Sequence, residues 1–385
     1  MAKSSDYRIR LATPEDALEI TLLYHRVYNG TYTDPLMRDV GLLTAFLSEP
    51  ANVWAVAEKK GSIVGSVAWE TDERNRLAKV FGGVVLPEHR GADLLEKSMT
   101  FGAERLQAGR GRADVIYATT RTTSQAPQIV AERLGYKKLG IFPNIHRTDA
   151  YETHCLTAFF CEGALAKRFT GFKLHPKFTG LVDIVRSEIG IPRIPVAKPS
   201  EYAVSQPAPA EIPALEIIDA PLFTLHRFRS LQEDRKIPFH FYPFHQPNVI
   251  IASPCRKIEI FAFLAPADQY CTLVGIRKPD DTLFAHVLSK ASELLHRRGV
   301  RYIETIARAD KLKTVEGILQ ARFVPCAYFP AFQLHNKLRY DYAVLSKTFE
   351  ILDFQGAQLA GTNRKFLREY YRNWRDIFLG PNLMD

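Results

Sequence analysis

The sequence predicts an α/β fold class, with two tandem domains that are each built on a mixed, mostly antiparallel sheet flanked by helices. Three observations lead to this prediction. The chain has 385 residues, which is long for one hydrophobic core. A proline-rich stretch at residues 191–213 divides it into halves of comparable size. The halves carry strand-like and helix-like hydrophobic patterns in alternation, as mixed α/β domains do.

The first half is expected to alternate strands with helices. Thr13 offers an N-cap and Pro14 a first helical position, so a helix is expected after a strand at residues 7–11. The Lys60-Gly61 pair favours a hairpin turn between strands at 53–58 and 63–70. Further strands are expected at residues 77–86, 115–119, 136–142 and 152–160, and further helices at 35–47, 94–108 and 124–134.

The second half is predicted to repeat the end of this plan. Helices are expected at residues 280–297 and 311–320, and strands at 302–306, 324–329 and 340–345. Two similar stretches end at Pro143 and Pro330, 187 positions apart, and the same offset relates Ile116 to Ile303. This shared offset predicts a duplicated fold. The predicted division is a first domain at 1–190, a linker at 191–213, and a second domain at 214–385 that ends in a helix.

The composition is that of a globular protein with an anionic partner. Hydrophobic residues make up 46% and charged residues 24%, and no apolar run is long enough to predict a membrane span. No apolar leader is visible, and five scattered cysteines fit free thiols, so a cytoplasmic location is expected. The net charge of +9 suits a nucleotide cofactor, a phosphorylated carrier or a nucleic acid. Because the basic residues are spread along the chain, nucleic acid is not favoured.

The most informative stretch is a strand that ends at a proline and continues through a short loop into a helix. Gly91 has no Cβ, so a pyrophosphate can approach the backbone there. Arg90 adds a charge-assisted contact, and the unpaired N–H groups at the helix start also attract anions. The residues expected to hold a nucleotide are Val85, Leu86, His89, Arg90, Gly91 and Ala92.

This stretch resembles the signature of the GNAT superfamily of acyl-CoA-dependent N-acyltransferases. That signature is a strand ending in hydrophobic-x-Pro, then Gln/Arg-x-x-Gly-x-Gly/Ala, then a helix. The expected order of elements also matches the family, over about residues 7–160. Glu88 stands where the family has Gln or Arg, and Asp93 where it has Gly or Ala. The resemblance implies GNAT-like domains that use acyl-CoA, such as acetyl-CoA, as co-substrate; no metal is expected.

A hydroxyl-rich loop follows the strand at residues 115–119. In the GNAT fold the strands splay apart at this point and expose backbone groups to the pantetheine arm. The resemblance therefore implies that Thr119 and Ser124 contact the coenzyme. Candidates for binding the acceptor are Thr120, Arg121 and Glu152. The alternative is an ordinary strand-to-helix loop with Ser124 as N-cap.

The family's usual general acid is a tyrosine on the helix before a Gly-hydrophobic pair. Here the pair is Gly135-Tyr136, and Ala131 stands at the tyrosine's place. The candidate acids are therefore Tyr136, Tyr151 and Cys155. The candidate bases are Glu70, which is followed by Asp72 and Glu73, and His154, which has Glu152 two residues away.

The second half carries weaker signals. Its loop at residues 275–281 has no glycine after Pro279 and ends in two acids, so this half is not expected to bind coenzyme A. His240 and His245 lie among aromatic residues; a spacing of five without a third ligand is poor for a metal, which leaves pocket lining or packing. Residues 364–378 predict an aromatic and basic helix that either docks onto the body or contacts an anionic partner.

Three functions remain open. The first is acyl transfer from acyl-CoA, or from an acyl-carrier protein, to a primary amine of a small-molecule or carrier-bound acceptor by direct attack. The second is an aminoacyl-tRNA-dependent transferase of the Fem type, which also has tandem GNAT-like domains but needs no coenzyme turn. The third is a non-catalytic GNAT-fold binding or scaffold protein, which the missing tyrosine favours.

Overall fold

A computed structural model describes residues 6–30, 32, 34–107, 112–147, 150–204, 213–238, 240–280 and 282–380. Their strands are hydrogen-bonded in one mixed sheet of 14 strands, in the order β1-β2-β3-β4-β5-β7-β6-β13-β14-β12-β11-β10-β9-β8. Two compact units are distinguished. Unit 1 comprises Met1–Thr119, Ala126–Lys137 and Thr157–Ala166, and unit 2 comprises Thr120–Gln125, Lys138–Leu156 and Lys167–Asp385.

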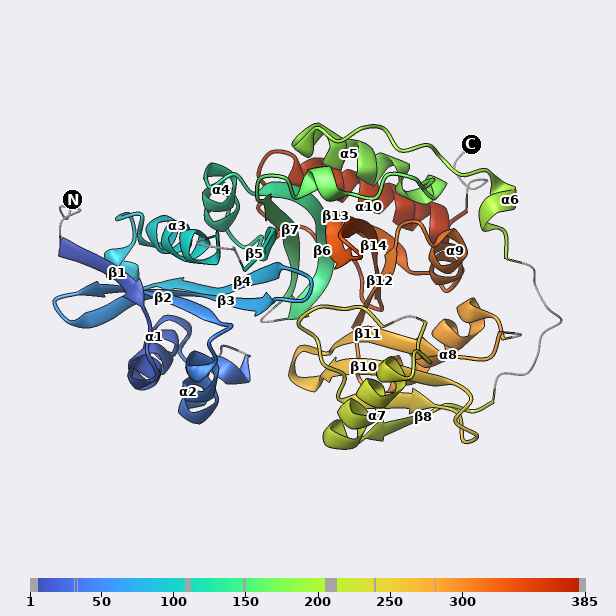
Figure 1. Ribbon diagram of the computed structural model, residues 1–385, viewed down its shortest axis with the longest axis horizontal. Helices are drawn as coiled ribbons and strands as arrows, with labels where there is room; N and C mark the ends of the chain where they lie inside the picture. The colour runs from blue at the N-terminus through green and yellow to red at the C-terminus, as the bar shows by residue number, and fades with distance from the viewer. Residues whose placement is uncertain are drawn as a thin grey trace. The chain divides into compact units, whose positions relative to one another are not determined.

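The described residues up to Phe160 contain seven of these strands and four α-helices (Figure 1). In chain order they are β1 (Tyr7–Leu11), α1 (Ala17–Tyr28), α2 (Val40–Ser48), β2 (Val53–Lys59), β3 (Ser62–Asp72), β4 (Leu77–Val85), α3 (Leu94–Gln107), β5 (Val115–Arg121), α4 (Ala126–Arg133), β6 (Lys137–Arg147) and β7 (Tyr151–Phe160). This order agrees with the predicted one. Strands β5, β6 and β7 contribute residues to both units, so the division by compactness does not follow the proline-rich stretch.

Unit 1 has a hydrophobic core on each face of its sheet. In β2, Trp54 and Val56 belong to a core shared with α1 and α2, whereas Val53 and Ala55 belong to a second core shared with α3. Figure 1 shows α1 and α2 on one side of β2 and β3, and α3 on the other. Because successive side chains of a strand point to opposite faces, burial of both faces explains the nearly continuous apolar run of β2.

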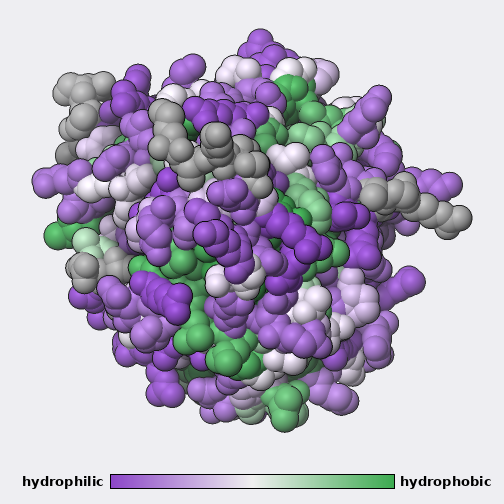
Figure 2. Space-filling view, turned by 90° about the vertical axis from the view of Figure 1, so that its left-hand side faces the viewer, coloured by the Kyte–Doolittle hydropathy of each residue, from purple (hydrophilic) through white to green (hydrophobic). Residues whose placement is uncertain are grey.

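The outer surface of unit 1 is largely hydrophilic, with single apolar side chains among charged ones. Leu18, Leu22 and Leu42 are exposed on the outer faces of α1 and α2. Figure 2, which views the chain from the left-hand side of Figure 1, shows hydrophobic patches enclosed by hydrophilic side chains. In the described part of the chain, no helix is both long and apolar enough to cross a membrane.

The chain after residue 167 supplies the remaining elements of unit 2. They are α5 (Thr179–Ile189), α6 (Pro199–Tyr202), β8 (Glu216–Asp219), α7 (Pro221–Glu233), β9 (Val249–Ala252), β10 (Glu259–Ala265), β11 (Tyr270–Arg277), α8 (Phe284–Arg297), β12 (Tyr302–Arg308), α9 (Leu312–Gln320), β13 (Val324–His335), β14 (Leu338–Thr348) and α10 (Asn363–Phe378). Helices α5 and α10 lie side by side and both pack on β13 (Figure 1).

Strands of both halves of the sequence lie in one sheet, which corrects the prediction of a separate sheet for each domain. The join within unit 2 is between β6 and β13, where Gly140 is paired with Ala327. A Cβ built on Gly140 would lie 2.1 Å from the Cβ of Ala327, closer than any real contact. The absence of a side chain at Gly140 therefore allows the two backbones to meet.

Part of the predicted linker is packed within unit 2. The N–H of Leu174 donates to the carbonyl of Pro195, and the N–H of Ala197 donates back to Leu174. Ile191 and Ile194 are also buried. Their apolar side chains explain why residues 191–204 do not form the predicted free linker, while residues 205–212 lie outside the described residues.

A buried carboxylate ties the chain before α5 to β13 and β14. Asp341 accepts from the guanidinium of Arg168, the hydroxyl of Tyr328 and the backbone N–H of Ala331. All of these side chains are buried. A buried charge with several such partners is strongly destabilised when one partner is removed, so this network fixes the local arrangement.

The contact at Gly140 can be tested by a one-carbon change. Gly140→Ala should lower the free energy of unfolding by about 1–3 kcal/mol, the usual cost of overpacking a filled site. Gly356→Ala is the matched control, because a Cβ there meets nothing within 4 Å. Urea denaturation of both full-length variants measures the effect. Equal midpoints for the two variants would contradict the close approach of β6 and β13.

Candidate functional site

The predicted nucleotide turn lies in unit 1 between β4 and α3. A short 3-10 turn at Pro87–His89 follows the strand, and α3 begins at Leu94. The N–H of Leu86 donates to Val64 of the neighbouring strand, and the N–H of Arg90 donates to the carbonyl of Pro87. The backbone of the turn is thus held at both ends, and the N–H groups of the first helical turn remain for a ligand.

The surface of this turn is open. Gly91 has a φ of +85° and is exposed, and a Cβ built on it would meet no atom within 4 Å. Arg90 is exposed, and its Nε donates to the carbonyl of Val85 at 3.3 Å, which holds its guanidinium at the turn. An exposed backbone beside a guanidinium suits a phosphate group. The carboxyl group of Asp93, exposed at the same turn, opposes an anion there.

The other predicted nucleotide residues differ in their exposure. Leu86 is buried in the core with α1 and α2, and Val85 and Ala92 pack against that core. The Nδ1 of His89 is 3.1 Å from the hydroxyl of Tyr7, and the two rings pack edge-to-face. Leu86 and His89 therefore pack beneath the turn inside unit 1. The groups open to a ligand are the side chain of Arg90 and the backbone of Gly91 and Ala92.

The strand before the turn has an unpaired stretch. The parallel ladder of β4 with β5 runs from Leu77↔Val115 to Val80↔Ala118. Beyond Val80, β4 continues to Val85, and its ladder partner there is β3. The backbone of β4 on the β5 side is thus left without a ladder over this stretch, where an extended ligand can pair with it.

Glu70 lies on β3 beside this strand, directly opposite Lys79 of β4. Burial raises the pKa of the Glu70 carboxyl above its ordinary value, Lys79 opposes the shift, and Asp34 and Asp72 add to it. A carboxyl with a raised pKa is a better general base near neutral pH than an exposed one. Among the predicted bases of unit 1, Glu70 therefore has the environment that general-base catalysis favours.

Three tyrosines that the sequence analysis did not select form a wall near the unpaired stretch of β4. Tyr24, Tyr28 and Tyr32 have ring centroids 4.7–6.3 Å apart. The hydroxyl of Tyr24 donates to the carbonyl of Gly82 on β4. Tyr24 and Tyr28 are one helical repeat apart on α1, whereas Tyr32 lies in the loop after the helix ends at Tyr28, so the meeting of all three rings depends on the fold.

A second group of predicted residues lies within unit 2. Arg121 donates from Nε and Nη2 to the two carboxylate oxygens of Glu152, at 2.7 and 2.5 Å. The Nε2 of His154 is 3.7 Å from Glu152 and has no hydrogen-bond partner among the residues that the structure describes. Burial lowers the pKa of the His154 imidazole, and the nearby Glu152 partly offsets this. His154 is therefore a neutral base candidate, whereas the charges of Arg121 and Glu152 compensate each other.

A second histidine extends this group. His146 forms an ion pair with Asp268, with Nδ1 and Oδ1 3.1 Å apart, and its ring centroid is 6.0 Å from that of His154. The hydroxyl of Tyr151 donates to the side chain of Gln269 at 3.3 Å. Tyr151 and His154 were predicted from the sequence, whereas His146 and Asp268 were not, because these two residues meet only through the fold.

Two of the predicted acids are buried away from solvent. Burial raises the pKa of the Cys155 thiol to about 12, and that side chain is fully buried. Tyr136 belongs to the core with α3 and packs on Phe159, and burial raises its pKa also. Both are weak proton donors at neutral pH, so Tyr151, which is half-buried, is the predicted acid with the best access.

The residues of the hydroxyl-rich loop and the two histidines of the second half differ in their exposure. Thr119 and Ser124 are exposed, whereas Thr120 is buried with an unpartnered Oγ1. His240 lies at the surface with Nδ1 2.7 Å from the carbonyl of Ile237. His245 packs against aromatic rings of unit 2. No group of three potential metal ligands occurs among the residues that the structure describes.

Comparison with known proteins found no match among protein-family models and none among curated proteins. Several solved structures are similar in fold. A GNAT family acetyltransferase from Streptococcus pneumoniae is 21% identical, with a TM-score of 0.36 over 40% of this chain and 99% of its own. The yncA protein of Salmonella typhimurium, solved with its cofactor acetyl-CoA, is 17% identical over 41% of this chain and 95% of its own, with a TM-score of 0.36.

A third similar structure is the ribosomal-protein-S5-alanine acetyltransferase of Vibrio fischeri. It is 17% identical, with a TM-score of 0.36 over 41% of this chain and 94% of its own. Each neighbour covers only about 40% of this chain, so the tandem arrangement lies beyond the compared part.

The group around Glu152 makes a prediction about proton affinity. Glu152→Gln removes the carboxylate that stabilises protonated His154, so the pKa of His154 should fall below its value in the unchanged protein. An NMR titration of the imidazole signals, with the His154 signal assigned from His154→Asn, measures this. Glu162→Gln, an exposed change, is the control. A rise in the pKa of His154, or no change, would show that Glu152 does not stabilise the protonated imidazole.

Proposed function

We propose that this chain is an acyl-CoA-dependent N-acyltransferase that binds its donor at the β4–α3 turn of unit 1. The observation that carries the proposal is the turn itself: an open, positive-φ Gly91 beside an exposed Arg90 at the start of a helix. The turn follows a strand whose last residues have no parallel partner. Together these features can hold a pyrophosphate and pair with the amide-containing arm of the donor.

The proposed donor carries its acyl group in a thioester bond. The N–H groups around Gly91 and the guanidinium of Arg90 would hold its phosphates, and the free edge of β4 would align the arm. The proposed base is Glu70, whose raised pKa allows it to take a proton from an ammonium group. Holding the amine and the thioester in line contributes to the rate through orientation.

A second candidate function is a non-catalytic GNAT-fold binding protein. The specific observation in its favour is the burial of Tyr136 and Cys155, which leaves two of the predicted acids without access to a thiolate. This candidate keeps the coenzyme turn but predicts no release of free thiol from acetyl-CoA. Titration and turnover experiments together therefore separate the two functions.

The second half is proposed to be a degenerate copy of the first. Strands β12, β13 and β14 begin 187 positions after β5, β6 and β7. The parallel ladder of β11 and β12 also ends at Leu273↔Thr305, as that of β4 and β5 ends at Val80↔Ala118. The connection from β11 to α8 carries Lys278, Pro279 and Asp280 and no glycine, so one coenzyme is expected per chain.

The donor site is tested by titrating acetyl-CoA into two glycine variants. Gly91→Val places a side chain where a phosphate would lie and should weaken binding by roughly 1–3 kcal/mol. Gly61→Val is the matched control, because Gly61 has a similar φ of +82° and equally open surroundings at the β2–β3 turn. Calorimetry should give one site per chain. Equal affinities of the two variants would remove the turn from the donor site.

The base is tested by the pH profile of thiol release from acetyl-CoA with a panel of primary amines. Glu70→Gln should lower kcat about 10²- to 10⁴-fold and abolish the rise in rate as pH increases through the pKa of Glu70. Glu73→Gln, an exposed change in the same segment, should leave the profile unchanged. A profile in which Glu70→Gln keeps both the rate and the rise would exclude Glu70 as the base.

A further inference from the structure

Helix α10 has an inner face that is buried against the rest of unit 2 and an outer face that is exposed. Asn363, Phe366, Tyr370 and Asn373 are buried, and α10 packs on β13 and α5. These four residues recur at three- and four-residue intervals, as one stripe of a helix does. On the other face, Arg368, Tyr371 and Arg372 are exposed.

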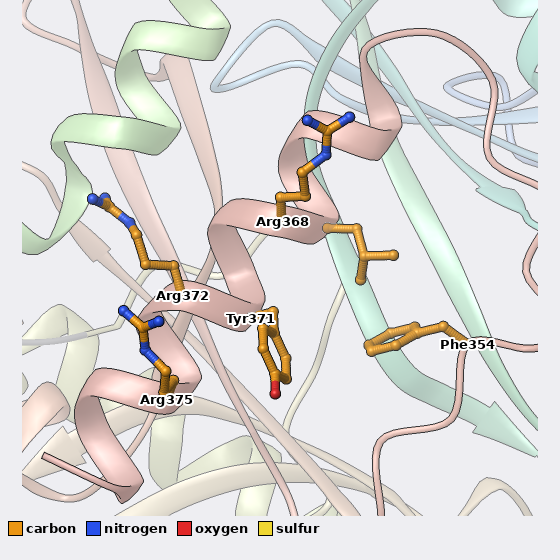
Figure 3. Close-up of a pocket in the computed structure, with 6 residues that line it drawn as sticks. Phe354, Arg368, Tyr371, Arg372 and Arg375 are labelled. Carbon is orange, nitrogen blue, oxygen red and sulfur yellow. The ribbon is translucent and has the colours of Figure 1, made fainter. Parts of the chain in front are cut away.

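A cavity of about 520 Å³ lies on this outer face, within unit 2. It is lined by Phe354, Leu367, Arg368, Tyr371, Arg372 and Arg375. Figure 3 shows the guanidinium groups of Arg372 and Arg375 beside each other on one side of α10, and the rings of Tyr371 and Phe354 on the other. The cavity thus has a cationic side and an apolar side, and its size is that of small-ligand sites.

The charge of α10 is positive and incompletely paired. The helix carries five basic and two acidic residues. Glu369 is paired with Arg372, and Asp376 with Lys177 and more distantly with Arg375. Arg368 has no ion pair among the described residues. The two carboxylates are thus engaged, and the cationic side of the cavity keeps a net positive charge.

Aromatic rings continue along the helix from the cavity. The rings of Tyr371 and Trp374 are stacked at 6.0 Å with an interplanar angle of 15°, and those of Trp374 and Phe378 at 5.4 Å and 27°. Tyr371 is 52% exposed. Trp374 and Phe378 are half-buried, so Tyr371 is the exposed end of this series, and its ring would bury a large apolar area if a partner covered it.

We infer that the outer face of α10 binds single-stranded nucleic acid. Arginines beside exposed aromatic rings suit a chain of phosphates beside bases, since phosphates pair with guanidinium groups and every base can stack on a ring. Arg368 and Arg375 are separated by about 10 Å along the helix, from the rise of 1.5 Å per residue. A row of this length matches several phosphates of a strand better than the single phosphate of a mononucleotide.

This inference also explains the composition. The sequence carries a net charge of +9, but the basic residues are not clustered along the chain. On α10 the helical repeat gathers Arg368, Arg372 and Arg375 around one cavity. The surface involves unit 2 only and makes no use of the β4–α3 turn, so it is independent of the proposed acyl transfer.

The test is fluorescence anisotropy with a fluorescein-labelled 12-nucleotide oligouridine RNA and the full-length protein at several salt concentrations. Arg368→Gln should weaken binding and reduce the slope of log affinity against log salt by about 0.7, the value for one phosphate contact of a single strand. Tyr371→Ala should weaken binding roughly tenfold with an unchanged slope, since stacking does not release counterions. Lys365→Gln, exposed on α10 but outside the cavity, should have a smaller effect than Arg368→Gln.

Competition experiments decide between the other occupants. If inorganic polyphosphate of about 12 units binds as tightly as the RNA, and Tyr371→Ala does not change RNA binding, the surface is only electrostatic and the inference fails. If AMP binds as tightly as the RNA, the site is one for mononucleotides and the inference also fails. An absence of RNA binding overturns it directly. The variants should bind acetyl-CoA as the unchanged protein does, so the failure of this inference leaves the proposed donor site untouched.

Discussion

The approach of Gly140 to Ala327 is the contact through which the two halves of the sequence share a sheet. Strand β6 pairs with β13 at this point, and β7 lies next to β6 on its other side. A single Cβ at residue 140 would occupy space that the neighbouring backbone already fills. The strand that carries Glu152 and His154 therefore lies next to the strand that makes this contact.

Much of the fold was predictable because its signals are local. The strand at 77–86 and the helix at 94–108 correspond to β4 and α3, and the proline and glycine between them mark the turn. The predicted helix at 124–134 corresponds to α4. Such elements follow from hydrophobic periodicity and turn residues within about ten positions. The meeting of Gly140 with Ala327 depends on register between distant strands, which periodicity does not specify.

The candidate site was predictable to a smaller extent, because burial and pairing decide which residues can act. Cys155 and Tyr136 lie in apolar surroundings, and only the fold shows that both side chains are buried. Arg121 and Glu152 lie 31 positions apart and meet because their strands end side by side, so the sequence presented them as two separate charges. His146 and Asp268 were not predicted for the same reason, and Tyr32 joins Tyr24 and Tyr28 of α1 only because the loop after the helix folds back.

Asp93 combines a backbone conformation that glycine adopts most easily with a negatively charged side chain. Its φ of +54° is in the left-handed region, which aspartate tolerates better than most residues with a side chain. Its carboxylate at the start of α3 also suits the positive end of the helix dipole. The same carboxylate competes with a phosphate for that end. Asp93 is therefore compatible with the backbone and the helix but opposes an anion, which leaves Arg90 and the N–H groups around Gly91 to supply the attraction in the proposed donor site.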